Sequence, residues 1–375
     1  MLKLVLIVAG SAGSLAGQSR FLYPAPPPES FTIARDIRFA RVDTIDLAMD
    51  VYRPAGRTGP APALILFSPF LPGSERRRAH EWLVGWASVA ASKGLAAVIP
   101  DIRWGLAQDF RLFIDHLTQH AGRYGIDPNA LALFAGSGPV SDAFPLVEDS
   151  GQTAIKAGVM YYGVANVTKF RRDLPILYVR AGLDRPPLNA EIARLATLAL
   201  SQNAPLTLLN HPTGHHAFEL TDDDASTQQL IDLTIDFVKR ALAREYQLEL
   251  RRGQPEATAA AHMATGNYRE AASTFATLVS ARPEDHRLRL SYGEALLADR
   301  QYPAACAEFE KLKGKSLGPR DLGLPAARAC MQKGDPDAAL AWLRSIPRRF
   351  LPRDIEQEAV FAPLRNRPEF RALFP

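Results

Sequence analysis

The sequence predicts an α/β domain with a mostly parallel sheet and helices on both faces, followed by an all-α domain of helical repeats. From Ala63 to Ala243, short apolar runs alternate with longer amphipathic segments, which is typical of a buried parallel sheet. Beyond Gln247, small and aromatic residues recur every 34 positions. The length of 375 residues also exceeds one ordinary domain, so we expect two.

The first domain is expected over residues 31–247, and its elements follow from the spacing of apolar residues. Two strand-like runs at its start have no helix between them, which predicts an antiparallel edge of the sheet. The later strands are apolar throughout, as strands covered on both faces are. Strands are expected at 31–42, 45–54, 63–70, 95–100, 130–136, 155–163, 174–182 and 205–210, and helices at 79–94, 109–125, 188–202 and 225–243.

The composition is that of a globular protein, with 47% hydrophobic and 22% charged residues. The net charge of +4 is small for this length, and no long basic run is interleaved with aromatic residues, which disfavours nucleic-acid binding. Only Cys306 and Cys330 are present, so the sequence offers neither a disulfide framework nor a zinc cluster of cysteines. We expect two free buried thiols, and a bond between them is the alternative.

Residues 1–17 have the features of a cleavable signal peptide. Lys3 gives a positive start, Leu4–Ala16 is apolar, and Ser14 and Ala16 are small residues at the spacing that signal peptidase accepts. The apolar stretch is too short to form a stable membrane span. We expect a periplasmic or secreted protein, with an uncleaved anchor or a disordered tail as the alternatives.

Three segments place a serine, an acid and a histidine just after apolar strands. In LALFAGSGPV the strand runs into a turn carrying Ser137, while Asp184 ends ILYVRAGLD and His216 lies in the loop after LTLLN. A serine hydroxyl becomes an effective nucleophile when a histidine takes its proton and a carboxylate orients that histidine. The order along the chain therefore predicts a catalytic triad of Ser137, Asp184 and His216.

Other acids and histidines lie near these positions. Asp173 precedes its strand and would lie at the wrong end of the sheet. His211 directly follows its strand and is expected to be structural, whereas His215 is the alternative base beside His216. A metal site built from these histidines would need further ligands, and the sequence has no HExxH-like pair. We expect neither a metal nor a cofactor.

The turn around Ser137 departs from the common Gly-x-Ser-x-Gly pattern, with Ala135 and Pro139 in place of the two glycines. Alanine adds one methyl group, and proline is tolerated in the first turn of a helix. Gly138 follows the serine directly, and its N–H is the expected first donor to an oxyanion.

The rest of the pocket is expected from loops that follow other strands. Pro69 has no N–H, so Phe70 or Leu71 is expected to supply the second oxyanion donor. Trp104 and Tyr162 also follow strands and are candidates for lining the substrate pocket, with packing in the core as the alternative.

Residues Phe31–Gln247 resemble the α/β-hydrolase superfamily, especially its dienelactone-hydrolase-like esterases. The resemblance rests on the serine turn, on GHHAF around His216, and on YGIDPNALALFAGS at Tyr124–Ser137. It implies hydrolysis of a small-molecule ester or related acyl compound through an acyl-enzyme, without a cofactor. Dienelactone hydrolases often use cysteine where this chain has Ser137, so their substrate is not carried over.

The C-terminal region, residues 254–375, resembles tetratricopeptide repeats. Tyr302 and Phe309 lie 34 residues after Tyr268 and Phe275. Small residues keep the same phase at Ala271, Ala305 and Ala339 and at Ala259, Gly293 and Ala327, and Leu343 continues the aromatic series. The tail FAPLRNRPEFRALF is expected to form a capping helix.

Tetratricopeptide repeats imply a protein or peptide partner, self-association or added stability for this chain. The alternative to an esterase is a catalytically inactive hydrolase-like scaffold that binds its partner through the repeats.

Overall fold

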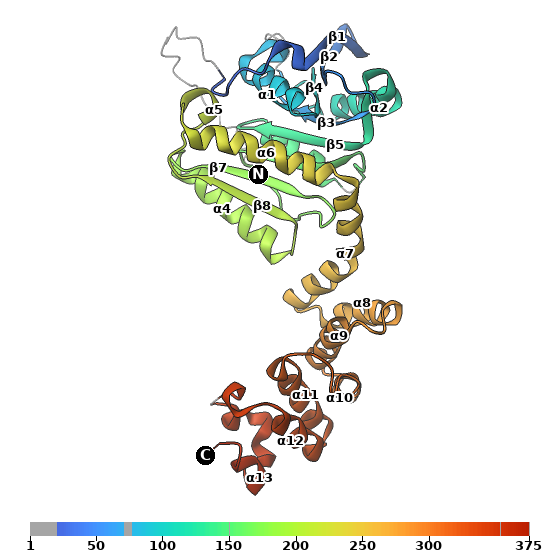
Figure 1. Ribbon diagram of the computed structural model, residues 1–375, viewed down its shortest axis with the longest axis vertical. Coiled ribbons are helices and arrows are strands. Elements are labelled where there is room, and N and C mark those ends of the chain that lie inside the picture. The colour runs from blue at the N-terminus through green and yellow to red at the C-terminus, as the bar shows by residue number, and fades with distance from the viewer. Residues whose placement is uncertain (1–20, 71–76, 150, 353, 375) are drawn as a thin grey trace, which may run out of the picture.

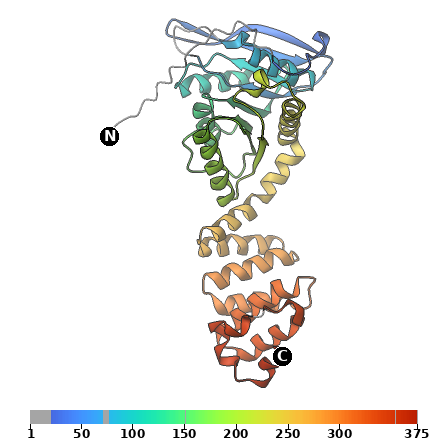
Figure 2. The same cartoon turned by 90° about the vertical axis from the view of Figure 1, so that its left-hand side faces the viewer.

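The computed structural model describes residues 21–374 except 71–76, 150 and 353, so the expected signal peptide and Leu71 lie outside the described residues. Figures 1 and 2 show a sheet domain at one end of the long axis and a stack of helices at the other, with α7 (Arg244–Ala264) joining them. A sheet-containing part and a helical part of the chain are thus connected by one helix.

Eight strands form one sheet, in the order β1-β2-β4-β3-β5-β6-β7-β8. β2 runs antiparallel to both of its neighbours, and the strands from β4 onward in this order are mutually parallel. The predicted mostly parallel sheet with an antiparallel edge is confirmed. The strands are β1 (Phe31–Val42), β2 (Ile45–Pro54), β3 (Ala61–Leu66), β4 (Ala96–Pro100), β5 (Ile126–Gly136), β6 (Ile155–Tyr161), β7 (Ile176–Ala181) and β8 (Leu206–His211).

Helices cover both faces of the sheet. Because side chains alternate along a strand, Leu131 and Leu133 of β5 enter one apolar core, while Ala132 and Phe134 enter the other. The first core lies under α2, α3 and α4, and the second lies under α1 and α6. These helices and the single turn α5 are α1 (Glu81–Ser92), α2 (Ala107–Tyr124), α3 (Val140–Glu148), α4 (Pro186–Ser201), α5 (Phe218–Thr221) and α6 (Ala225–Leu242).

The second domain is a series of helices in which each packs against the next. Its core contains the phased residues Ala271, Phe275, Ala305, Phe309 and Leu343. The polar stretch LELRRGQPEA between the two domains is part of α7, in which Pro255 removes one backbone hydrogen bond without ending the helix. The remaining helices are α8 (Tyr268–Ala281), α9 (His286–Ala298), α10 (Tyr302–Glu310), α11 (Pro319–Lys333) and α12 (Pro336–Ser345).

The tail does not form the single capping helix that was expected. It forms the 3-10 helix η5 (Ala359–Leu364) and the short α13 (Pro368–Arg371), because Pro363 and Pro368 interrupt the hydrogen bonds of a continuous helix. Phe361 and its neighbours Leu364 and Phe370 are nevertheless buried against the repeat core. The tail therefore still covers the end of the repeats.

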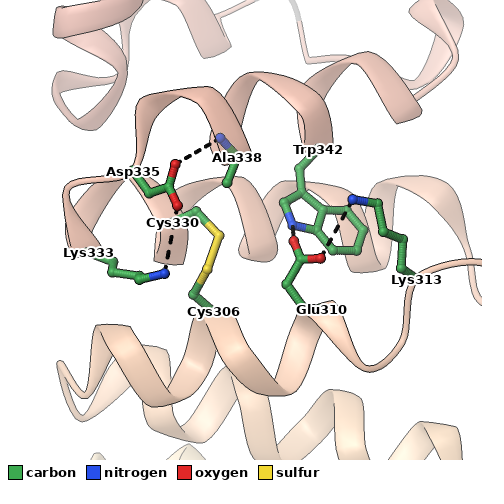
Figure 3. The surroundings of a disulfide bond; sticks show 8 residues. All are labelled: Cys306, Glu310, Lys313, Cys330, Lys333, Asp335, Ala338 and Trp342. Atoms are coloured by element: carbon green, nitrogen blue, oxygen red, sulfur yellow. Dashed lines mark hydrogen bonds and ion pairs between the residues drawn. A yellow bond between two sulfur atoms is a disulfide. The ribbon is translucent and has the colours of Figure 1, made fainter.

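The expectation of two free thiols is wrong. Cys306 on α10 and Cys330 on α11 form a disulfide, with their Cα atoms 5.2 Å apart (Figure 3). These two helices belong to successive repeats and pack against each other, which brings the two sulfur atoms within bonding distance. The bond therefore joins two repeats by a covalent link.

Candidate active site

Ser137 lies at the tight turn between β5 and α3. Its backbone φ is 60°, in the left-handed region that residues other than glycine rarely adopt. Its N–H donates to the carbonyl of Tyr161 at 2.9 Å, which ties the turn to the neighbouring strand β6. A side chain at Gly163 would place a Cβ 2.2 Å from the Ser137 carbonyl oxygen, so this approach requires glycine. The surrounding sheet therefore holds the serine in a strained conformation.

The three predicted triad residues meet at the carboxyl ends of the strands. Ser137 Oγ lies 2.7 Å from His216 Nε2, and His216 Nδ1 lies 2.5 Å from Asp184 Oδ2. A carboxylate only accepts hydrogen bonds, so Nδ1 carries a proton and Nε2 is free to accept the proton of the serine hydroxyl. Asp184 is almost fully buried, and its second oxygen accepts the Arg185 N–H at 2.7 Å.

The alternative residues lie elsewhere. His215 is exposed, and its Nδ1 is 3.0 Å from Asp222 Oδ1. His211 is fully buried and contacts the Thr227 hydroxyl at 3.1 Å, as expected for a structural histidine. Asp173 pairs with Arg171 before β7 begins, at the opposite end of the sheet from Asp184.

A pocket of about 450 Å³ opens over Ser137. Gly138, Trp104 and Tyr162, all singled out from the sequence, line it. A Cβ on Gly138 would lie 3.2 Å from the Trp104 ring, so this half-exposed tryptophan covers the proposed oxyanion site. Tyr162 is buried, with its ring centroid 4.8 Å from that of His216. The pocket is also lined by Ser68, His80, Trp82, Leu83, Gly136, Pro139, Ala217 and Leu220.

Phe70 is not placed to supply an oxyanion donor. Its N–H donates to the Ile102 carbonyl at 2.8 Å, and its own carbonyl accepts the Trp104 N–H at 2.8 Å. The expectation for Phe70 is therefore wrong, because a parallel bridge between two loops already uses its backbone. Ser68, which precedes Pro69 and lines the pocket, was not considered in the sequence.

Two other pocket residues were also missed in the sequence. His80 caps α1, where its Nδ1 accepts the Trp82 N–H at 3.3 Å, and both residues line the pocket. Their sequence signal is the start of a helix, AHEWL, directly after the loop that follows β3. A helix start of this kind is common, so it does not by itself indicate a pocket.

Within the described part of the chain, no group of histidine, cysteine, aspartate and glutamate side chains is arranged to hold a metal ion. Across the same residues, no helix combines the length and the apolar character needed to cross a bilayer.

A family model for the tetratricopeptide repeat matches residues 256–319, which include α8, α9 and α10. The sheet order, with an acid and a histidine after the two strands that follow β6, is that of α/β-hydrolases. The N-terminal domain has the α/β-hydrolase fold, and the C-terminal domain contains tetratricopeptide repeats.

Several solved structures are similar to the α/β-hydrolase domain. MGS-M1, an α/β-hydrolase enzyme from a Medee basin deep-sea metagenome library, is 14% identical with a TM-score of 0.46, covering 57% of this chain and 99% of its own. Esterase LipW from Mycobacterium marinum is 15% identical with a TM-score of 0.48, and the match covers 57% of this chain and 83% of LipW. A bacterial heroin esterase is 14% identical with a TM-score of 0.44, and the match covers 57% of this chain and 84% of the esterase. No match was found among curated protein sequences.

Proposed function

We propose that this chain is a serine hydrolase that cleaves carboxylic esters or related acyl compounds. The observation that carries the proposal is the continuous contact from Ser137 through His216 to Asp184 at the base of an open pocket. A buried carboxylate, an oriented imidazole and a serine on a strained turn are together what acyl transfer requires.

The reaction would proceed in two steps. Ser137 Oγ attacks the ester carbonyl carbon while His216 Nε2 takes the hydroxyl proton, and the same proton then passes to the departing alcohol. The resulting acyl-enzyme is cleaved by a water molecule, whose proton His216 takes and returns to Ser137. Throughout both steps, Asp184 stabilises the positive charge on His216.

The negative charge that develops on the carbonyl oxygen needs N–H donors. Gly138 follows the serine and is exposed at the pocket, which supports it as the first donor. Because Pro69 has no N–H and the Phe70 N–H is already bonded, we propose that the second donor is the N–H of Leu71, which lies outside the described residues, or of the pocket-lining Ser68. Ser68 is the last residue before Pro69 and lies on the pocket surface.

Hydrolysis of p-nitrophenyl butanoate by the full chain tests this proposal. Ser137→Ala removes the nucleophile and is expected to lower kcat by a factor of about 10⁶, with an unchanged melting temperature. The matched control is Ser141→Ala, because Ser141 lies four residues after Ser137, in the first turn of α3, and its hydroxyl donates to the Gly138 carbonyl. Equal activity in Ser137→Ala and Ser141→Ala would contradict the proposal.

The repeats favour a second role for the chain. Because tetratricopeptide repeats bury their small residues between helices and leave an outer surface for contacts, we propose that residues 254–375 bind a protein or peptide partner. A wild-type chain that binds such a partner but hydrolyses no ester would support the inactive scaffold instead.

We further propose that the chain is exported to the periplasm or secreted. The apolar run after Lys3 and the small residues Ser14 and Ala16 support a cleavable signal. The disulfide between Cys306 and Cys330 adds support, because such bonds persist in oxidising compartments. The mature mass of protein from its host tests this, and an intact Met1 in the cytosolic fraction would contradict it.

A further inference from the structure

A buried glutamate lies behind the pocket. Glu219 lies on α5, three residues after His216, and its side chain is fully buried. Its Oε1 accepts three hydrogen bonds, from the indole N–H groups of Trp82 and Trp86 at 3.1 and 3.2 Å and from the Tyr162 hydroxyl at 3.2 Å. Its Oε2 has no hydrogen-bond partner within the described residues.

Burying this group is costly, because water no longer solvates its charged form. Burial raises the pKa of Glu219 to about 7. A leucine would fill a similar volume without that cost. It would, however, leave two indole N–H groups and a phenol hydroxyl buried without an acceptor. The three donors that meet at Oε1 therefore account for a carboxyl group at this position.

Two of these donors belong to the pocket wall. Trp82 and Tyr162 both line the pocket that contains Ser137. A Cβ on Gly136 would lie 2.9 Å from the Trp82 ring and 3.5 Å from the Tyr162 hydroxyl, so both side chains reach the end of β5. The Tyr162 ring also contacts His216. A shift of either ring would therefore change the pocket next to the reacting atoms.

The backbone around Glu219 is fixed as well. Its carbonyl accepts the N–H of Leu22 at 2.7 Å, which ties α5 to the start of the described chain. The neighbouring Phe218 is fully buried against Tyr161 and Tyr162. The backbone that carries this carboxyl group is thus held in place, which a group needs if it is to orient other side chains.

The polar atoms of Trp82 and Tyr162 are bonded in the interior. Trp82 Nε1 and the Tyr162 hydroxyl both donate to the buried Oε1 of Glu219, so neither donor is free to bond a polar group of a substrate. A polar substrate group against such a surface would lose its water without gaining a hydrogen bond. An apolar group has no hydrogen bonds with water to lose when it packs there.

Resting on the esterase function proposed above, we propose that Glu219 is a positioning residue that holds the polar edges of Trp82 and Tyr162 inward and thereby fits the pocket to esters with an apolar group against this wall. Glu219 does not touch the substrate. It acts through the two aromatic side chains, which it orients by accepting their hydrogen bonds at Oε1.

Two pairs of esters of matched shape test this on the full chain. On the acyl side, p-nitrophenyl butanoate is compared with p-nitrophenyl methoxyacetate, and on the alcohol side, butyl acetate with 2-methoxyethyl acetate. In each pair an ether oxygen replaces one methylene. The preference for the hydrocarbon member is the ratio of kcat/KM values, and intrinsic reactivity cancels when this ratio is compared between variants.

Glu219→Leu removes the acceptor and is expected to reduce the hydrocarbon preference in one pair by about tenfold, mainly through a higher KM for the hydrocarbon ester. Glu219→Gln retains an acceptor oxygen and is expected to stay within about threefold of wild type. Tyr162→Phe removes only one donor and gives a milder variant should Glu219→Leu fail to fold. Glu148→Gln is the matched control, because Glu148 is also largely buried but at the far end of α3.

An active, folded Glu219→Leu with the wild-type preference in both pairs would overturn the role of Glu219 and leave the esterase proposal intact. A Glu219→Gln as impaired as Glu219→Leu would show that the charge, not the acceptor, is needed, and would also overturn it. Wild-type protein that hydrolyses none of the four esters would instead contradict the proposed function.

Discussion

The two domains hold their cores together in different ways. In the hydrolase domain, strands distant in sequence pair side by side, so that β3 lies between β4 and β5. In the repeat domain, each helix packs chiefly on the one before and the one after it. The candidate active site therefore depends on the whole sheet, since Ser137, Asp184 and His216 come from three separate strand ends. The repeats can change locally without disturbing it.

The domains differ as much in their buried chemistry. Among the described residues, every buried acidic side chain, from Asp50 to Glu219, lies in the hydrolase domain. The disulfide between Cys306 and Cys330 lies in the repeat domain. Burial also raises the pKa of Glu294 in the repeat domain, but the larger shifts, to about 7, are those of Glu148 and Glu219 in the first domain. The comparison therefore teaches that pH should act mainly on the first domain and a reductant on the second.

After Ser137→Ala, the largest effect is expected from Asp184→Asn, which keeps the shape of the site but favours the wrong tautomer of His216. We expect kcat to fall by about 10⁴ with little change in stability. Asp222→Asn is the matched control, because Asp222 pairs with His215 outside the triad. The assay is ester hydrolysis, and a greater loss in Asp222→Asn would move the base to His215.

Phe309→Ala tests the independence of the repeat domain. Phe309 is fully buried, and its ring packs so closely on α9 that a Cβ on Gly293 would lie 2.5 Å away. The cavity left is expected to destabilise this domain by about 3–5 kcal/mol. Hydrogen exchange followed by mass spectrometry should show faster exchange in α8–α12 only, with unchanged ester hydrolysis. Loss of activity would show that the domains are coupled.

Cys306→Ala removes the link between α10 and α11. The bond closes a loop of 24 residues, for which the expected loss is about 3 kcal/mol in the repeat domain. Chemical unfolding with and without dithiothreitol measures it. The variant should be insensitive to the reductant, and the triad should remain active in both conditions. An equal effect of reductant on the variant would contradict this account.

A smaller effect is expected from pH on the hydrolase domain. Burial raises the pKa of Glu148 from 4.5 to about 7, so between these values the folded state binds more protons than the unfolded state. The free energy of unfolding should therefore fall as pH rises through this window. Glu148→Gln should make the fall shallower, as measured by urea unfolding at several pH values. A steeper fall in the variant would contradict the assignment.

Much of the hydrolase domain followed from its sequence, because apolar strands and amphipathic helices have distinct periods. The order of Ser137, Asp184 and His216 also indicated which strand ends meet, since the ends of parallel strands share one edge of a sheet. The distances between the three residues depend on the order of the strands in the sheet, and the spacing of apolar residues along the chain does not predict that order.

Other features depended on tertiary contacts. Phe70 was expected to donate to an oxyanion, but its N–H pairs with Ile102, a residue 32 positions away. Glu219 lies on a turn too short to show any period, and its partners Trp82 and Tyr162 come from distant elements. The Cys306–Cys330 bond could not be predicted, because a sequence shows that two cysteines lie in apolar helices but not that their sulfur atoms meet.

The central claim is that Ser137 is an activated nucleophile, and labelling with a fluorophosphonate tests it most directly. This reagent reacts with serines whose proton is taken by a histidine. We expect one adduct per chain, on the peptide that contains Ser137, with loss of ester hydrolysis in step with labelling. Asp184→Asn should label far more slowly. A wild-type chain that remains unlabelled, or that is labelled elsewhere while Ser137 is unmodified, would contradict the claim.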